Sequence, residues 1–179
     1  MVEGMGAREH APVAGHDRYP GRIPTAKILV EFVSLFDDDI GCWDTSRVTD
    51  MGGMFYEAVA FDQNLSCWDT SRVTDMGGMF SEAVAFDQDL SCWDTSKVET
   101  VYDEADDGGM FEGATVFDHP IGSWDTSKVE SLASMFRKAI AFNQPLADWD
   151  VSKVKSMDST FRAGCGNTEP CPDAFSQDL

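Results

Sequence analysis

Apolar residues recur along the chain at a fixed spacing, and this spacing predicts the local structure. Between Trp68 and Trp93 the apolar positions are Val73, Met76, Met79, Phe80, Ala83, Phe86 and Leu90. Residues of the same types recur at the equivalent places in the other units. The spacings of three and four residues after Met79 predict one face of a short helix, whereas the stretch after Val73 is long enough only for a short strand or a turn. Each unit is therefore predicted to run from strand to turn to short helix and back.

Tryptophan gives the period of the repeat. The residues of this type are Trp43, Trp68, Trp93, Trp124 and Trp149, which are separated by 25, 25, 31 and 25 positions. One unit therefore carries an insertion, located in residues 102–109. A unit this short cannot enclose its own apolar face, so we expect neighbouring units to stack and to bury the tryptophans in a continuous structural core.

The repeat divides the chain into four parts. Residues 1–22, rich in Gly, Pro, Arg and His, are expected to form a flexible N-terminal tail. Residues 23–42 align with half a repeat and are expected to form a helical N-terminal cap. Residues 43–163 form the repeat proper, and residues 164–179 are expected to form a C-terminal cap or tail that keeps the last core layer from water.

Composition and charge exclude several classes of protein. A hydrophobic content of 42% is too high for a disordered chain. The net charge of −19 repels phosphate backbones, so we expect no nucleic-acid partner. No stretch approaches the ~20 apolar residues of a bilayer span, and residues 1–22 lack the apolar region of a secretory signal. We therefore expect neither a membrane span nor an export signal within this sequence.

The repeat resembles a known family. The pattern WDTSxVTDMxxMFxxAxxFDQxLSxW, followed from Trp43 to Trp149, is similar to the BspA-like leucine-rich repeat of mycoplasma-type lipoproteins and bacterial surface proteins. This resemblance implies an α/β repeat solenoid, a right-handed leucine-rich-repeat-like coil in which each unit of 25 residues contributes a short parallel strand and a short helix. It also implies display at a cell surface or outside the cell, with an organelle or the cytoplasm of a protist or alga as the alternative. It implies binding to other proteins and carries over no catalytic residue.

Stacking of the units turns each repeated polar residue into a column. One column of aspartates precedes Ser by two positions, which is typical of an Asx turn; its members are Asp44, Asp69, Asp94, Asp125 and Asp150. A second column contains Asp62, Asp87 and Asp118, and stacked carboxylates repel one another unless a cation or a donor lies between them. Both explanations of the second column, bound calcium and backbone hydrogen bonds, remain open. We expect no resident cofactor.

The cysteines fall into two groups. Cys42, Cys67 and Cys92 form a column in which parallel side chains are too far apart for a disulfide, so we expect free thiols. Cys165 and Cys171 flank a short polar loop and are a candidate disulfide in an oxidising compartment.

Two surface features are candidates for partner binding. The column after the repeated valine varies from unit to unit, and its members are Thr49, Thr74, Glu99, Glu130 and Lys155. The insertion concentrates negative charge, and insertions in repeat proteins often lie on the binding face; its acidic residues are Asp103, Glu104, Asp106 and Asp107. A solvated loop without a partner is the alternative interpretation of the insertion.

No motif in the chain predicts catalysis. Two of the three histidines lie in the tail, and no nucleophile elbow, HExxH motif or phosphate-binding glycine loop is present. We therefore expect a non-enzymatic protein-binding or scaffold module, with a protein partner that carries a basic surface. The alternatives are a structural subunit or linker fixed inside a larger multiprotein complex and a calcium-dependent cell-surface adhesion domain.

Overall fold

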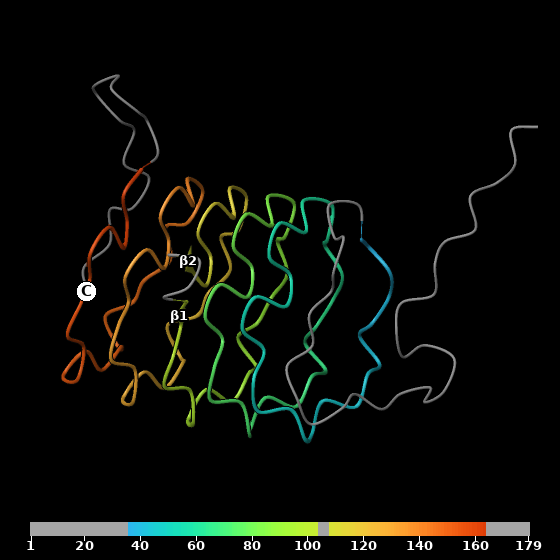
Figure 1. Ribbon diagram of the computed structural model, residues 1–179, viewed down its shortest axis with the longest axis horizontal. Coiled ribbons are helices and arrows are strands. Elements are labelled where there is room, and N and C mark those ends of the chain that lie inside the picture. Colours follow the sequence, from blue (N-terminus) through green and yellow to red (C-terminus); the bar gives the residue numbers. More distant parts are fainter. Residues whose placement is uncertain (1–35, 104–107, 164–179) are drawn as a thin grey trace, which may run out of the picture.

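The computed structural model describes residues 36–103 and 108–163, in which the chain winds through a series of coils that lie side by side in sequence order (Figure 1). Isolated parallel bridges connect neighbouring coils and fix their register. They pair Asp50 with Asp75, Asp75 with Thr100, and Ser131 with Ser156. Residues one repeat apart therefore lie next to each other along the axis of the coil.

The two named strands frame the insertion. Strand β1 spans Tyr102–Asp103 and strand β2 spans Gly108–Gly109, and they pair antiparallel with Tyr102 opposite Gly109 and Asp103 opposite Gly108. The two ends of the insertion are thus paired with each other, and residues 104–107 between them lie outside the described residues. The remainder of the described chain consists of turns and isolated bridges and contains no helix.

The prediction of an α/β leucine-rich-repeat-like solenoid, with a strand and a helix in each unit, is wrong. An α-helix satisfies its backbone internally, each N–H bonding to the carbonyl four residues earlier. Here the donors alternate instead: Phe80 donates to Met110 O of the next coil at 2.8 Å, and Ser81 donates to Gly78 O within its own coil at 3.0 Å. Glu82 then donates again across to the next coil, to Glu112 O. The chain is a repeated coil of turns, bonded locally and between coils.

Left-handed backbone conformations interrupt any helix at the same places. Glu57, Glu82 and Lys138 have φ values of 57°, 58° and 62°, and Gly53 and Gly78 have φ values of 62° and 60°. Left-handed φ is rare outside glycine and breaks a right-handed helical path. The spacing of three and four residues that predicted a helix therefore marks successive turns, each of which directs one apolar side chain inward.

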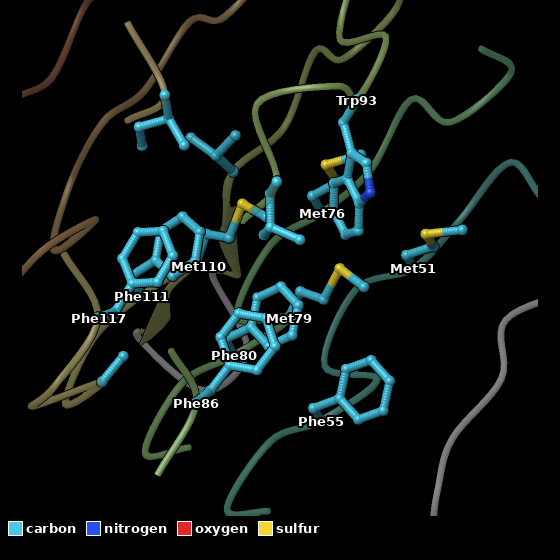
Figure 2. Packing of buried hydrophobic residues seen from close by; sticks show 14 of the residues in the cluster. Met51, Phe55, Met76, Met79, Phe80, Phe86, Trp93, Met110, Phe111 and Phe117 are labelled. Carbon is cyan, nitrogen blue, oxygen red and sulfur yellow. The ribbon is translucent and has the colours of Figure 1, made fainter. Parts of the chain in front are cut away.

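Stacked phenylalanines form the centre of the core (Figure 2). One column has ring centroids 5.4 to 5.8 Å apart from coil to coil, and consists of Phe55, Phe80, Phe111, Phe136 and Phe161. A second column has centroids 5.6 to 6.1 Å apart, and consists of Phe36, Phe61, Phe86, Phe117 and Phe142. The two columns touch within each coil, as where Phe80 and Phe86 stack at 4.0 Å. Stacked aromatic pairs contribute about 0.5–1.5 kcal/mol each beyond the burial of their area.

The tryptophans form a further column beside the phenylalanines. Trp43 stacks on Trp68 with centroids 6.5 Å apart, and Trp93 stacks on Trp124 at 6.4 Å. Four indole N–H groups donate to a backbone carbonyl of the preceding coil, from Trp68 to Ile40, Trp93 to Leu65, Trp124 to Leu90 and Trp149 to Ile121, at 3.0 to 3.1 Å. These four tryptophans therefore both fill the core and hydrogen-bond one coil to the next, whereas Trp43 is half-buried at the edge of the described core.

Only part of the predicted N-terminal cap lies in the described range. Phe36 stacks on Phe61 at 5.6 Å, and Ile40 is buried in the core. Residues 36–42 contain no helix. Residues 1–35 and the predicted C-terminal cap at 164–179 lie outside the described residues.

Candidate partner-binding surface

One side of the coil presents a regular column of exposed polar side chains. We call it the strand-side face, and its column consists of Thr49, Thr74, Glu99, Glu130 and Lys155, all exposed. The valine before each of the first four is buried. Successive residues that point alternately inward and outward are the pattern of a half-buried strand. The structure therefore brings these five sequence-predicted residues onto one surface.

Hydrogen bonds between coils hold this face in place. The N–H of Thr74 donates to Thr49 O at 2.8 Å, and the Thr74 hydroxyl donates to the same carbonyl at 3.1 Å. The N–H of Glu99 donates to Thr74 O at 2.8 Å. Because the backbone is fixed before a partner arrives, little ordering is needed on binding.

Charge on the face changes toward its C-terminal end. Lys155 Nζ lies 2.7 Å from Glu130 Oε2, although both side chains remain largely exposed. The hydrogen bond from Lys155, and after it the lysine charge, hold the pKa of Glu130 below its ordinary value. An exposed pair of this kind contributes little to stability, so its main effect is on the charge that a partner meets.

A basic column runs beside the strand-side face, two positions earlier in each unit. Its members are Arg47, Arg72, Lys97, Lys128 and Lys153, and all are exposed. Lys128 Nζ donates to Ser96 O of the preceding coil at 2.7 Å. Within residues 36–103 and 108–163, the other four form no ion pair. The charges of Lys97 and Lys153 act at longer range on Asp94 and Asp150, and the exposed side chains can still contact anionic groups of a partner.

The acidic insertion approaches the preceding coil closely. A Cβ on Gly77 would lie 2.9 Å from the carbonyl of Tyr102, so glycine is required for the hairpin to pack there. Asp103, at the end of β1, is half-buried. The other predicted acidic residues, Glu104, Asp106 and Asp107, lie outside the described residues.

Backbone donors occupy the column of Asp62, Asp87 and Asp118. The N–H of Asp87 donates to Asp62 Oδ1 at 2.9 Å, and Gln88 Nε2 donates to the same oxygen at 2.8 Å. Asp118 donates to Asp87 in the same way, and Asn143 donates to Asp118. His119 takes the place of glutamine in this series, with Nε2 2.9 Å from the Asp87 carbonyl oxygen and 3.4 Å from Oδ1. Donors thus lie between the stacked carboxylates.

The predicted Asx turns are present. Each aspartate accepts the N–H of the serine two residues later, at 2.9 to 3.1 Å, for Asp44, Asp69, Asp94, Asp125 and Asp150. Hydrogen bonds from serine hold the pKa of Asp69, Asp94, Asp125 and Asp150 below the ordinary value. The same bonds offset repulsion along the column.

An ion cluster around the buried residue Glu112 was not predicted from the sequence. The Glu112 side chain is only 8% exposed and lies 3.2 Å from Arg137 Nη1 and 3.7 Å from Lys138 Nζ. Lys138 also pairs with Glu82 at 2.9 Å, although the two residues lie in coils on either side of the one that contains Glu112. The only signal in the sequence is that Glu112 and Arg137 occupy the place that Ser81 holds in its unit.

Burial dominates the electrostatics of Glu112. It raises the pKa of this carboxyl, and the charges of Arg137 and Lys138 oppose that rise. The Oε2 atom is buried and accepts no hydrogen bond from the described residues. Gly113 makes the cluster possible, since a Cβ there would lie 2.6 Å from the Glu82 carboxyl.

The remaining candidates contribute no assembled site. Cys42, Cys67 and Cys92 are exposed free thiols, and Cys165 and Cys171 lie outside the described residues. In the part of the chain that the structure describes, no three His, Cys, Asp or Glu side chains are placed to hold a metal ion. No helix there is long and apolar enough to cross a bilayer.

Comparison with known proteins gives one match. The family model described as "Mycoplasma protein of unknown function, DUF285" matches residues 26–104 and 105–170. The boundary between the two matched segments falls within the insertion. No curated protein and no solved structure gave a significant match.

Proposed function

Because the chain belongs to the family described as Mycoplasma protein of unknown function, DUF285, we propose that it is a non-catalytic protein-binding module of the BspA-like type. The binding surface is the strand-side face together with the basic column. The motif that runs from Trp43 to Trp149 supports the BspA-like assignment, and this resemblance implies display at a cell surface. The scaffold role follows from a core whose repeated columns hold the outward side chains at fixed intervals.

The observation that carries the proposal is a column of exposed cations on a hydrogen-bonded surface. In the described residues, none of Arg47, Arg72, Lys97 and Lys153 forms a direct ion pair, although the charges of Lys97 and Lys153 act at longer range on Asp94 and Asp150. Side chains fixed at regular intervals on a hydrogen-bonded backbone can meet a partner without ordering a loop. This arrangement supports binding at the face itself.

The charges define the partner more closely. The net charge of −19 favours the approach of a protein that is basic overall. At contact, the basic column requires anionic groups in register with it. We therefore propose a protein partner of basic overall character whose contact patch carries acidic side chains.

Calcium-dependent adhesion has less support than this proposal. The carboxylates of Asp62 and Asp87 already accept hydrogen bonds from the next coil. A bound calcium ion would have to replace those donors and gather several more oxygen ligands. A fixed structural subunit uses the same face as a binding module and differs in how tightly the complex is held.

Affinity capture tests the proposal. The intact chain is immobilised and exposed to an extract of its source cells in parallel with the double variant Arg72→Glu, Lys97→Glu. We expect the variant to lose at least about tenfold of the captured partner, because reversing contact charges replaces attraction with repulsion. The matched control is Asp148→Lys, a charge reversal at an exposed residue outside the face.

Three outcomes distinguish the proposed binding surface from its alternatives. Equal capture by the intact chain and the double variant would contradict the proposal. A third variant, with residues 102–109 shortened to Gly-Gly, separates the insertion from the face: loss of the partner with this variant alone would place binding at the hairpin. A complex that persists at high salt indicates the fixed-subunit alternative, because exposed charge pairs are screened there.

A further inference from the structure

A row of aliphatic side chains runs along a different edge of the coil, which we call the corner ridge. It lies at the turn after each Phe-x-x-Ala stretch. The residue directly after the alanine is Val59, Val84 or Ile140 in three coils and Thr115 in the coil after the insertion, where the exposed aliphatic residue is Val116, one position later. Val59, Val116 and Ile140 are 39%, 44% and 55% exposed, and Val84 and Thr115 are half-buried. In the first coil, the buried residues Met51, Met54 and Phe55 lie along the chain between Thr49 of the strand-side face and Val59 of the ridge.

Charge along the corner ridge reverses about its middle. At the left-handed turn position that borders the ridge, the first two coils carry Glu57 and Glu82, the third carries Gly113 and the fourth carries Lys138. The fifth coil carries the uncharged Ala163 at this position, with Arg162 one position earlier. The position therefore runs from two negative residues, through glycine, to one positive residue, and the adjacent Arg162 adds a second positive charge at the C-terminal end.

The end charges of this series are available for contacts outside the chain. Glu57 and Arg162 are exposed, and within the described ranges neither forms an ion pair. The inner charges already meet one another, since Lys138 Nζ reaches over Gly113 to Glu82 at 2.9 Å. The ridge is thus neutralised at its centre and opposite in sign at its ends.

A surface with this symmetry is complementary to itself. Rotation by 180° about an axis near Gly113 places the acidic end of one copy on the basic end of another, which is the arrangement of an isologous interface. We propose that the corner ridge is a homodimer interface, with two chains antiparallel, Glu57 facing Arg162 of the partner, and the aliphatic row of each copy covered by the other. This interface is independent of the strand-side face and would leave that face exposed on both copies.

The size and charge of the chain limit the strength of this dimer. The ridge is one side chain wide, so the interface belongs with complexes that bury less than about 1,200 Å² in total, which are weak or transient. Each chain also carries a net charge of −19, and at ~0.01 M salt, where the screening length is ~30 Å, the copies repel over a long range. At ~0.15 M salt the screening length falls to ~8 Å and the repulsion is largely removed. Dimerisation should therefore increase between these two salt concentrations.

Charge reversal with rescue tests the interface. Sedimentation velocity of the full chain over a concentration series, at ~0.15 M salt, gives the dimer dissociation constant. We expect Glu57→Arg alone, and Arg162→Glu alone, each to weaken the dimer about tenfold or more, because each places like charges in contact. The double variant restores the opposite-charge pairs with their signs exchanged, and its dissociation constant should return to within about threefold of the parent.

Controls separate loss of contact from loss of fold. Lys153→Glu, on the basic column and outside the ridge, should leave the dissociation constant unchanged, and Ile140→Glu should abolish the dimer. All variants should unfold at the same temperature when diluted to monomer. A chain that remains monomeric at every concentration, or a dimer unaffected by both single reversals, would overturn the proposal.

Discussion

The two coils that share the stretch CWDTSRVTDMGGMF, at residues 42–55 and 67–80, can be compared with the two that follow them, which carry the insertion and a diverged edge. The interior is the same in both regions. Phe55 and Phe80 stack with centroids 5.4 Å apart in the first, and Phe111 and Phe136 at 5.8 Å in the second. The edges differ, because glutamates at the left-handed turn give way to glycine and lysine. Stacking thus dictates the interior, whereas the edge can change its charge without changing the path of the chain.

Removing a core phenylalanine from each region should cause the largest loss of unfolding free energy, and comparing the two losses tests whether the regions share one core. Phe80 and Phe111 are both fully buried, and each stacks on neighbours in the adjacent coils. Phe80→Ala and Phe111→Ala should each lower the free energy of unfolding by about 3–5 kcal/mol, measured by urea denaturation. The two losses should agree within about 1 kcal/mol if the regions pack alike. Phe36→Ala, which changes a half-buried ring at the edge of the described range, should cost less and serves as the control.

Removing an indole hydrogen bond should also lower the free energy of unfolding, but by less than removing a core phenylalanine. Trp68→Phe and Trp124→Phe each remove one of the two donors to a carbonyl of the preceding coil, which keeps the backbone N–H of Trp43 or Trp93. The loss of one hydrogen bond costs about 0.5–1.5 kcal/mol, so both variants should be destabilised to a similar degree in thermal or urea unfolding. Trp43→Phe is the matched control, because the Trp43 indole N–H donates to none of the described residues. Equal losses at all three positions would contradict the role assigned to these bonds.

Glu112, in the later region, should make the free energy of unfolding depend on pH in a way that the earlier region does not. Its pKa is raised above 4.5 in the folded chain, so the native state binds its proton more tightly than the unfolded state does. The contribution of this residue to stability is therefore largest below 4.5 and falls as pH rises through the folded pKa. Glu112→Gln should remove that decline from a plot of unfolding free energy against pH. The matched variant Glu82→Gln, in the earlier region, should leave it in place, and an unchanged decline in Glu112→Gln would contradict the assignment.

The Asx turns should have the smallest effect on the free energy of unfolding, and the pH dependence of their contribution is opposite in sign to that of Glu112. Hydrogen bonds from Ser71 and Ser96 lower the pKa of Asp69 and Asp94, so these carboxylates stabilise the fold above 3.8 and lose that effect as pH falls through their folded pKa. Both are exposed, and Asp69→Asn or Asp94→Asn should change the unfolding free energy at pH 7 by less than about 1 kcal/mol. Thermal unfolding at neutral and acid pH measures this. The assignment would be contradicted if a variant lost several kcal/mol of unfolding free energy but kept the acid sensitivity of the parent, because the aspartate would then not act through its ionised carboxylate.

The columns of the coil could be read from the sequence, because stacking repeats every apolar and polar position at a fixed interval. The repeat period predicts which residues neighbour one another across coils, such as Phe36 and Phe61, and the spacing of Asp and Ser predicts the Asx turns. It also separates Val48 and Val73, which point inward, from Thr49 and Thr74, which point outward.

The conformation within each coil could not be read in this way. Apolar residues three and four apart fit a helix and a series of turns equally well, and the choice is made by hydrogen bonds between coils, which a local pattern does not contain. The left-handed conformations of Glu57 and Lys138 are a further case, since no glycine marks them. The Glu82–Lys138 pair joins residues two coils apart and depends on the missing side chain of Gly113, so neither residue alone predicts it.

A crystal structure of the chain tests the central claim most directly, and the residues to inspect are those from Met79 to Phe86. The account predicts that the Phe80 ring lies between those of Phe55 and Phe111, with centroids near 5.4 and 5.6 Å, and that the Phe80 N–H donates to the Met110 carbonyl. A helix through these residues, with the phenylalanine rings dispersed rather than stacked, would contradict it.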